Sequence, residues 1–354
     1  MHENLSEIAE KPVFFERNRV ARVYTGGKLF HGFFGDADAD GFLPEEWIAS
    51  VVRAINQGGD PREGLSTVRG TSILFSDLIA REKERMIGSR DNLGILVKVL
   101  DSAIRLPVQA HPDKPFSRKY FNSAFGKAEA WVVLATRENA KIHFGFKERM
   151  TKERFLEAIE KSESDKSAME GVLNAIPAKA GDVYFIPPRA VHAIGRGCLI
   201  LEIQEPTDFT LQPEAWCGDY HLTDGEKYLG LDRDAALTCF DYSLYGDEAV
   251  RLGKKRARVL RSEDGLLTEC LIGPEDTNCF TLNRHQFENR TLPDLAAPAV
   301  YLVTQGEGVL FSASGYAHAL KKGEYFFLPA CASRMYGVTS ESPMEILECL
   351  PPSE

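Results

Sequence analysis

The chain has 354 residues, of which 44% are hydrophobic, and its formal net charge at pH 7 is −10. A globular protein of this length can bury a large core and can hold two domains. The acidic balance argues against a nucleic-acid-binding surface, because such a surface needs clustered Lys and Arg. No apolar run reaches the roughly 20 residues that span a bilayer, and residues 1–12 lack the basic and then apolar pattern of a signal peptide. We therefore expect a cytoplasmic protein that binds a small molecule, with neither a membrane nor a nucleic-acid partner.

The seven cysteines lie scattered over the second half of the chain, without a C-x-x-C pair. This spacing is typical neither of a disulfide framework nor of a thiolate metal site. If the protein binds a metal, histidine and carboxylate side chains must supply the ligands.

Short apolar stretches separated by Gly, Pro, Asn or Asp recur along the chain, a pattern typical of a β-sandwich or barrel. A helix is expected first, at 44–56, and strands follow at 95–100 and 130–134. Two helices are expected next, one after Thr151 as N-cap and one from Ser167, where Glu170 would complete a capping box. They would form an insert at about 150–177, and further strands are expected at 183–186, 199–203, 301–303 and 325–328.

An internal repeat divides the chain. Gly181-Asp-Val-Tyr-Phe-Ile-Pro187 is followed five residues later by His192, and Gly323-Glu-Tyr-Phe-Phe-Leu-Pro329 is followed five residues later by Arg334. Both copies resemble the second cupin motif, in which Gly turns the chain, Pro ends a strand and a following His points into the barrel. Cupins are double-sheet jelly rolls.

We therefore predict a mainly β protein with two cupin-like jelly-roll domains and a small helical insert. Residues 1–225 would form a metal-bearing catalytic domain, 226–256 a connection, and 257–354 a degenerate domain that has lost the ligand His.

Three patches of the first half combine into a predicted metal site. Gln109 and His111 are two residues apart in an extended segment, so their side chains point the same way, and Lys127 and Glu129 share one face of the next expected strand in the same manner. Taken alone, each patch has a plain structural explanation, namely a hydrogen-bonded loop His or a surface ion pair. Together with His192 they supply nitrogen and oxygen donors without thiolate. Such a set suits one catalytic Zn²⁺ per chain, and Mn²⁺ or Fe²⁺ would also suit it.

One further carboxylate is expected near this site. Alternation along residues 199–204 places Ile200, Glu202 and Gln204 on one face of a strand, so Glu202 could face a polar cavity.

The motifs resemble those of a known enzyme family. Gln109-Ala-His-Pro-Asp113, Gly126-Lys-Ala-Glu129 and Gly181-Asp-Val-Tyr-Phe-Ile-Pro-Pro-Arg-Ala-Val-His-Ala-Ile194 resemble the Q-x-H-P-D, G-K-x-E and G-D-x-x-x-x-P-x-x-x-x-H-A motifs of type I phosphomannose isomerases, in the same order. The similarity runs from about residue 12 to 208, includes Pro44-Glu-Glu-Trp47, and thins beyond Gln212.

The resemblance implies that Gln109, His111, Glu129 and His192 hold the zinc, and that an aldose and a ketose phosphate interconvert through a cis-enediol. It also implies that Lys127, Glu202 and Asp208 line the substrate pocket. Lys127 and Glu202 would then have proton-transfer or orienting roles.

Two residues depart from the family pattern. Gln212 stands four residues after Asp208, where the family usually has Arg, and a neutral amide cannot replace a guanidinium that is always charged. Pro107 stands where a small hydroxyl residue is common, and it removes both a hydroxyl and a backbone donor.

The function expected is therefore the interconversion of mannose 6-phosphate and fructose 6-phosphate, with Gln212 among the residues that decide the substrate. Two alternatives stay open at this point. One is an isomerase that acts on a different sugar or sugar phosphate, and the other is a non-catalytic metal-cupin that binds a sugar. The sequence does not predict the oligomeric state.

Overall fold

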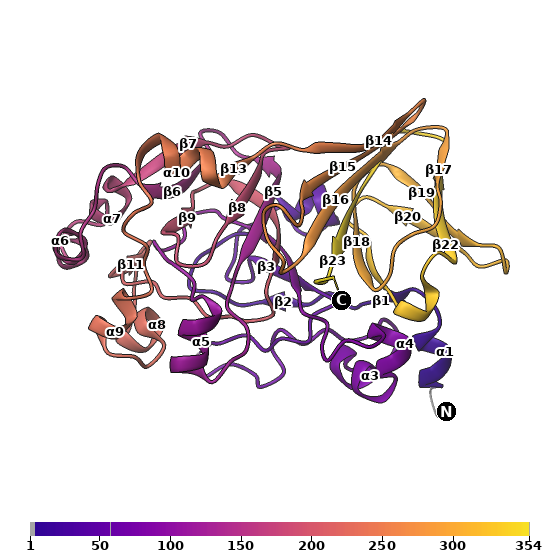
Figure 1. Ribbon diagram of the computed structural model, residues 1–354, viewed down its shortest axis with the longest axis horizontal. Coiled ribbons are helices and arrows are strands. Elements are labelled where there is room, and N and C mark those ends of the chain that lie inside the picture. The colour runs from indigo at the N-terminus through magenta and orange to yellow at the C-terminus, as the bar shows by residue number, and fades with distance from the viewer. Residues whose placement is uncertain (1–3, 57, 354) are drawn as a thin grey trace.

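The computed structural model describes residues 4–56 and 58–353 and shows a mainly β protein built from four layers of sheet (Figure 1). Two seven-stranded sheets pack against each other in the middle. A three-stranded sheet covers the outer face of one, and a four-stranded sheet covers the outer face of the other. Each outer sheet and its large sheet enclose a barrel interior.

The first barrel is formed by the sheet β13-β8-β5-β10-β4-β3-β2 and the sheet β7-β6-β9. The strands of the large sheet are β2 (Arg19–Val20), β3 (Glu45–Ile48), β4 (Leu96–Asp101), β5 (Glu129–Thr136), β8 (Val183–Ile186), β10 (Cys198–Gln204) and β13 (Lys254–Lys255). The smaller sheet contains β6 (Lys141–Phe146), β7 (Leu173–Pro177) and β9 (His192–Ile194).

The second barrel is formed by the sheet β1-β21-β18-β23-β16-β15-β14 and the sheet β17-β22-β19-β20. The large sheet contains β1 (Val13–Phe14), β14 (Arg258–Glu263), β15 (Leu266–Ile272), β16 (Thr281–Phe287), β18 (Ala299–Gln305), β21 (Tyr325–Leu328) and β23 (Met344–Leu350). The smaller sheet contains β17 (Arg290–Leu292), β19 (Glu307–Ser312), β20 (Ala317–Lys321) and β22 (Tyr336–Ser340).

The two large sheets repeat one topology, as the internal repeat of the sequence predicts. The order β8-β5-β10-β4-β3-β2 corresponds strand for strand to β21-β18-β23-β16-β15-β14. The glycines that open the two repeat motifs, Gly181 and Gly323, have φ of 88° and 82°. These are left-handed conformations that Gly adopts without steric cost.

Strand β10 shows why the sheets are apolar on both faces. Leu199, Leu201 and Ile203 pack between the two large sheets, whereas Ile200 packs into the first barrel. Each fully buried Leu or Ile contributes roughly 1.5–3 kcal/mol of transfer free energy. The buried polar residues of this strand, such as Glu202, therefore stand out against an apolar background.

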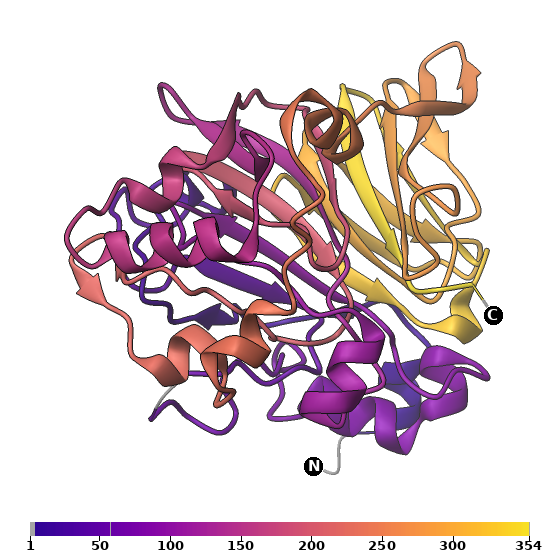
Figure 2. The same cartoon turned by 60° about the vertical axis from the view of Figure 1, so that its left-hand side comes forward.

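Helices lie at the two ends of the molecule (Figures 1 and 2). Beside the second barrel lie α1 (Leu5–Ala9), α3 (Phe75–Arg81) and α4 (Lys83–Ile87), and α2 (Phe30–Phe34) packs against the same central core. At the far end α5 (Lys114–Phe121), α6 (Lys152–Ser162), α7 (Ala168–Gly171), α8 (Asp224–Tyr228) and α9 (Arg233–Leu237) cover the outer face of the three-stranded sheet. The helix α10 (Gly246–Gly253), a 3₁₀ turn (Ala330–Ala332) and the short hairpin β11 (Trp216–Cys217) and β12 (Tyr220–His221) complete the elements.

The six predicted strands and the helix after Thr151 are confirmed. Each predicted strand lies on an observed one, and the Thr151 hydroxyl accepts the N–H of Arg154 at the start of α6. Among the described residues, no helix is both long and apolar enough to cross a bilayer.

One predicted helix is wrong, and a second is much shorter than predicted. Residues 45–48 of the segment 44–56 form strand β3 and all four are buried, so the acidic pair Glu45-Glu46 belongs to a doubly buried strand and not to a first helical turn. The helix from Ser167 is a single turn without a side-chain cap, and the apolar residues after it continue as β7. The expected insert of two helices at 150–177 is therefore two helices and one strand.

Short strands are exchanged between the barrels. β1, near the start of the chain, pairs with β21 of the second barrel, and β13 pairs with β8 of the first. The predicted domain boundaries stay a prediction.

Candidate metal centre and adjoining pocket

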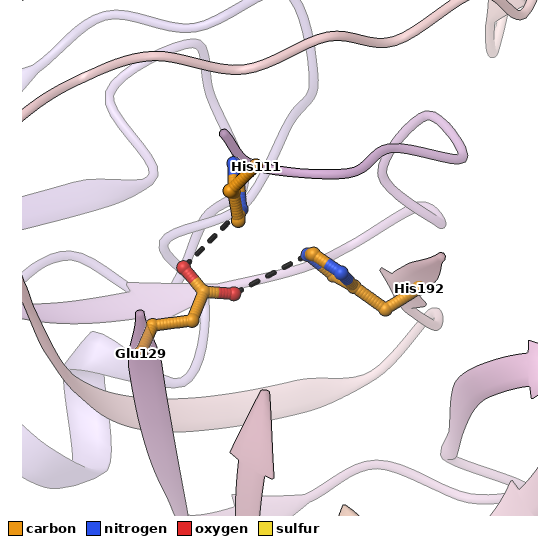
Figure 3. Close-up of side chains that lie close together, drawn as sticks. All are labelled: His111, Glu129 and His192. Carbon is orange, nitrogen blue, oxygen red and sulfur yellow. Dashed lines mark ion pairs between the residues drawn. The ribbon is translucent and has the colours of Figure 1, made fainter. Parts of the chain in front are cut away.

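Three buried side chains meet inside the first barrel (Figure 3). Glu129 is the first residue of β5, His192 is the first residue of β9 on the opposite sheet, and His111 lies in the extended segment after β4. Glu129 Oε2 lies 3.3 Å from His111 Nε2, and Glu129 Oε1 lies 3.3 Å from His192 Nε2. Two ligands that are each about 2.1 Å from a tetrahedral metal ion lie about 3.4 Å apart. The two observed distances of 3.3 Å are therefore close to the distance between two ligand atoms of one metal ion.

Both imidazoles are oriented by the backbone. Nδ1 of His111 is 2.9 Å from the carbonyl oxygen of Phe209, and Nδ1 of His192 is 2.8 Å from that of Ala190. A carbonyl only accepts, so each Nδ1 carries the proton and each Nε2 presents its lone pair to the centre. Burial lowers the pKa of His111 to about 3, and the neighbouring Lys127 ammonium lowers it as well, so this ring is neutral at pH 7.

The surroundings of the Glu129 carboxylate show whether a cation would fit between these side chains. Both of its oxygens are buried without a hydrogen-bond partner, and so is Nε2 of His192. Burial alone would raise the pKa of Glu129, but the neighbouring Lys127 ammonium helps to hold that pKa well below its usual value. Burying an ionised carboxylate without donors costs free energy. A divalent cation between these oxygens and the two Nε2 atoms would satisfy all of these groups, so the donor set fits a metal.

The structure places Gln109 beside this group. Gln109 and His192 exchange both backbone hydrogen bonds, each 2.9 Å long, and Gln109 lines the pocket onto which Glu129 opens. Of the four residues expected as ligands, Gln109 and Glu129 therefore line the pocket, and the two histidines contact Glu129.

Lys127 lies close to the centre. Its Nζ is 3.0 Å from Nε2 of His111 and 3.2 Å from Oε2 of Glu129, and the side chain lines the pocket. The expectation that Lys127 and Glu129 share one face is met by this ion pair.

Glu202 reaches the same pocket from the middle of β10. Its Oε2 accepts the indole N–H of Trp131 at 3.0 Å, and its Oε1 is 3.4 Å from Nζ of Lys98 and has no hydrogen-bond partner. Burial and the nearby Glu129 carboxylate raise the pKa of Glu202. One carboxylate oxygen is thus held by a hydrogen bond, and the other has only the ionic contact with Lys98.

The remaining expected residues, Asp208, Gln212 and Pro107, also line this pocket. Asp208 accepts hydrogen bonds from the Arg22 guanidinium, at 3.0 and 3.2 Å, and from the Ile55 backbone N–H at 2.8 Å. The Gln212 side-chain amide donates to the Glu226 carbonyl oxygen at 3.2 Å. The cavity is therefore lined by most of the residues predicted from the sequence, namely Pro107, Gln109, Lys127, Glu129, Glu202, Asp208 and Gln212. His111 and His192 do not line it but contact Glu129.

The sequence analysis missed a charged network on the wall of the pocket. Glu45 accepts from Arg22 at 2.9 Å, from Tyr24 at 2.7 Å and from the Trp47 indole at 2.6 Å, and Lys98 lies between Glu45 and Glu202 at 3.8 and 3.4 Å. Lys98 carried a signal, because a lysine in the middle of the apolar run 96–100 must find a buried partner. For Arg22, in a polar segment, the sequence offers no such signal.

The chain is similar in sequence to mannose-6-phosphate isomerases. It is 26% identical over 326 residues to the enzyme from Streptococcus mutans, and the aligned region covers 90% of this chain and 92% of that enzyme. It is 29% identical over 240 residues to mannose-6-phosphate isomerase ManA from Bacillus subtilis, which covers 68% of this chain and 70% of that one. A comparison with protein-family models gives no match.

Solved structures show the same fold. The mannose 6-phosphate isomerase from Bacillus subtilis superposes with a TM-score of 0.76 at 22% identity, covering 95% of this chain and 99% of that one. A mannose 6-phosphate isomerase solved with bound zinc and yttrium superposes with a TM-score of 0.70 at 16% identity, covering 97% and 100%. These comparisons confirm the family resemblance indicated by the motifs and the cupin-like fold predicted with it.

Proposed function

We propose that this relative of the type I phosphomannose isomerases is a metal-dependent aldose–ketose isomerase that interconverts mannose 6-phosphate and fructose 6-phosphate. One observation carries the proposal. A buried His–Glu–His group that fits a divalent metal opens onto a pocket that also contains a carboxylate and an ammonium, Glu202 and Lys127. The similarity to mannose-6-phosphate isomerases over 90% of the chain supplies the substrate pair.

The proposed metal is Zn²⁺, one per chain, held by Gln109, His111, Glu129 and His192. Imidazole nitrogens with a single carboxylate, without thiolate, suit zinc. When bound, the ion would act as a Lewis acid that polarises the sugar oxygens.

The residues around the centre can perform the proton transfers. The reaction removes a proton from the carbon next to the carbonyl and returns one to the adjacent carbon, while the hydroxyl proton changes oxygen. Glu202 offers an oxygen without a hydrogen-bond partner on the pocket wall, so we assign the carbon-bound proton to Glu202. Lys127 is a buried ammonium within the same pocket, and it would donate to the sugar oxygen on which negative charge develops.

The second barrel supports a single metal site per chain. Ile186 pairs with Glu129 in the first barrel, and its counterpart in the repeat, Leu328, pairs with Ala299. Arg334, the counterpart of His192, is exposed. Two of the ligand positions are therefore occupied by residues that cannot bind a metal inside the barrel.

The test is an assay of the zinc-loaded protein against a panel of aldose phosphates, ketose phosphates and free sugars. Turnover of mannose 6-phosphate at ordinary enzymatic rates is the expected result. Turnover of another sugar alone would support an isomerase of different specificity, and sugar binding without turnover would support a non-catalytic sugar-binding protein.

A further inference from the structure

The side of the pocket around Gln212 lacks a guanidinium at the position where the sequence resemblance leads one to expect it. Gln212 stands four residues after Asp208, and its amide is turned to a backbone carbonyl, that of Glu226. Four residues of extended chain span at most about 14 Å. An arginine at position 212 would therefore lie within reach of the same cavity as Asp208.

A different arginine occupies this pocket. Arg22, which follows β2, has a side chain that is only 13% exposed, and it is the one arginine among the described residues that line the cavity. Its Nε donates to Glu45, its Nη1 to Asn56, and its Nη2 to both oxygens of Asp208. The cation thus connects the N-terminal segment, the loop that carries Asn56, and the segment that carries Asp208.

Arg189, which follows the first repeat motif, lies outside the pocket. The guanidinium of Arg189 donates to the carbonyl oxygens of Thr238 and Cys239, its side chain is 43% exposed, and it does not line the pocket. Arg189 therefore cannot supply the missing charge.

The hydrogen bonds of Arg22 leave room for a ligand. A guanidinium has five N–H donors, and the contacts above occupy at most four of them, so one Nη1 N–H has no partner among the described residues. Without Arg22, the Asp208 carboxylate would keep only the backbone N–H of Ile55. Leaving a largely buried carboxylate with so few partners is costly, so the Asp208 segment would move toward solvent.

We propose that Arg22 is a positioning residue for the isomerase reaction, which fixes Asp208 in the pocket and supplies the guanidinium that Gln212 lacks. This inference rests on the proposed function. Arg22 can take the place of an arginine at position 212 because both residues line one cavity, although they are about 190 residues apart in the sequence.

The experiment moves the guanidinium. Four variants, Arg22→Gln, Arg22→Lys, Gln212→Arg and the double variant Arg22→Gln with Gln212→Arg, are compared with wild type for kcat and KM on mannose 6-phosphate, zinc content and thermal unfolding. Arg19→Gln is the matched control, because Arg19 is also a largely buried arginine with two carboxylate partners, Glu46 and Asp36, but does not line this pocket.

Arg22→Gln should lower kcat/KM about 100-fold, the effect of losing one well-placed electrostatic donor, while zinc content stays at the wild-type value. Arg22→Lys should recover about 10-fold, because an ammonium keeps the charge but cannot form the fork with Asp208. The double variant should be at least about 10-fold more active than Arg22→Gln, which a purely structural role of Arg22 would not produce, and Arg19→Gln should stay within about 3-fold of wild type.

The inference is overturned if Arg22→Gln stays within about 3-fold of wild type, or if a folded Arg22→Gln is not improved by Gln212→Arg. If Arg22→Gln does not fold, Arg22→Lys decides, and wild-type activity in a folded Arg22→Lys overturns the inference. Absence of turnover in the wild type itself refutes the proposed function, which is a separate outcome.

Discussion

Glu202 offers the sharpest test of the proposed chemistry. In Glu202→Gln the side chain keeps its shape, and the amide oxygen can still accept the Trp131 indole N–H that fixes Oε2 at 3.0 Å. What changes is the second oxygen, which lacks a hydrogen-bond partner and can accept a proton only as a carboxylate. Lys98 loses an ionic neighbour at 3.4 Å but keeps Glu45 at 3.8 Å.

The expected loss follows from the role. A positioned general base contributes about 10²–10⁴-fold to the rate, which corresponds to roughly 3–5 kcal/mol of transition-state stabilisation. We expect kcat to fall by that factor while KM changes little, because Gln fills the same space in the pocket. Zinc content should stay unchanged, since no metal-facing atom is removed.

Two measurements make the test specific. Steady-state kinetics with mannose 6-phosphate give kcat and KM, and NMR in D₂O follows exchange of the carbon-bound hydrogen at C2 of the sugar. Exchange should be lost together with turnover. If Glu202→Gln binds zinc, folds and retains kcat within about 3-fold of wild type, Glu202 does not carry the proton and the assignment passes to Lys127.

Three other perturbations follow from the structure. Glu129→Ala and His192→Ala should each strip the metal and leave a folded protein, because both barrels have large apolar cores; elemental analysis and circular dichroism check this, and global unfolding would make the site structural. Metal-replete wild type should contain one zinc per chain, so a stoichiometry of two would contradict the assignment to the first barrel alone. Glu45→Gln should lower the free energy of unfolding by about 3 kcal/mol in urea titrations, because it leaves the charges of Arg22 and Lys98 buried with fewer partners. Burial raises the pKa of Glu45, but Arg22 and Lys98 outweigh it and hold the pKa below its usual value. Glu45 therefore contributes stability above about pH 4 that is lost on acidification, and Glu45→Gln should lose less stability than wild type when the pH falls below that value.

Local sequence patterns predicted the sheet strands well because a strand buried on both faces needs an uninterrupted apolar run. The strands β8 and β21 fulfil this condition throughout, whereas β4 and β10 are each interrupted by one buried charged residue, Lys98 or Glu202, and end on a polar one. The segment 44–56 failed for a physical reason. Glu45 and Glu46 are charged residues whose partners Arg22 and Arg19 come from an earlier part of the chain, and burial by distant partners leaves no trace in a local pattern.

The candidate site was predictable where its residues sit at fixed short spacings. Lys127 lies two residues before Glu129, the first residue of β5, and their side chains form an ion pair. The Gly–Pro–His spacing of the repeat places His192 at the start of β9. Arg22 and Lys98 enter the pocket through tertiary contacts alone, with Asp208 and with Glu202 and Glu45. The His–Glu–His group could therefore be predicted from sequence, whereas the full charge arrangement of the pocket wall could not.

The second barrel has a buried carboxylate at the position that corresponds to Glu202. Its strand β23 carries Glu348 between Asn283 of β16 and Tyr301 of β18, as β10 carries Glu202 between Lys98 and Trp131. There the carboxylate is saturated, because Asn283 and the Tyr301 hydroxyl both donate to it at 2.7 Å.

In the first barrel the corresponding carboxylate keeps one oxygen without a hydrogen bond, and Glu129 keeps two. Unsatisfied buried oxygens cost stability, and a fold retains them where a ligand completes them. The contrast between two barrels of one topology thus separates what both barrels contain, a buried carboxylate bonded across the central strands, from what the proposed reaction would use, carboxylate oxygens without a hydrogen bond.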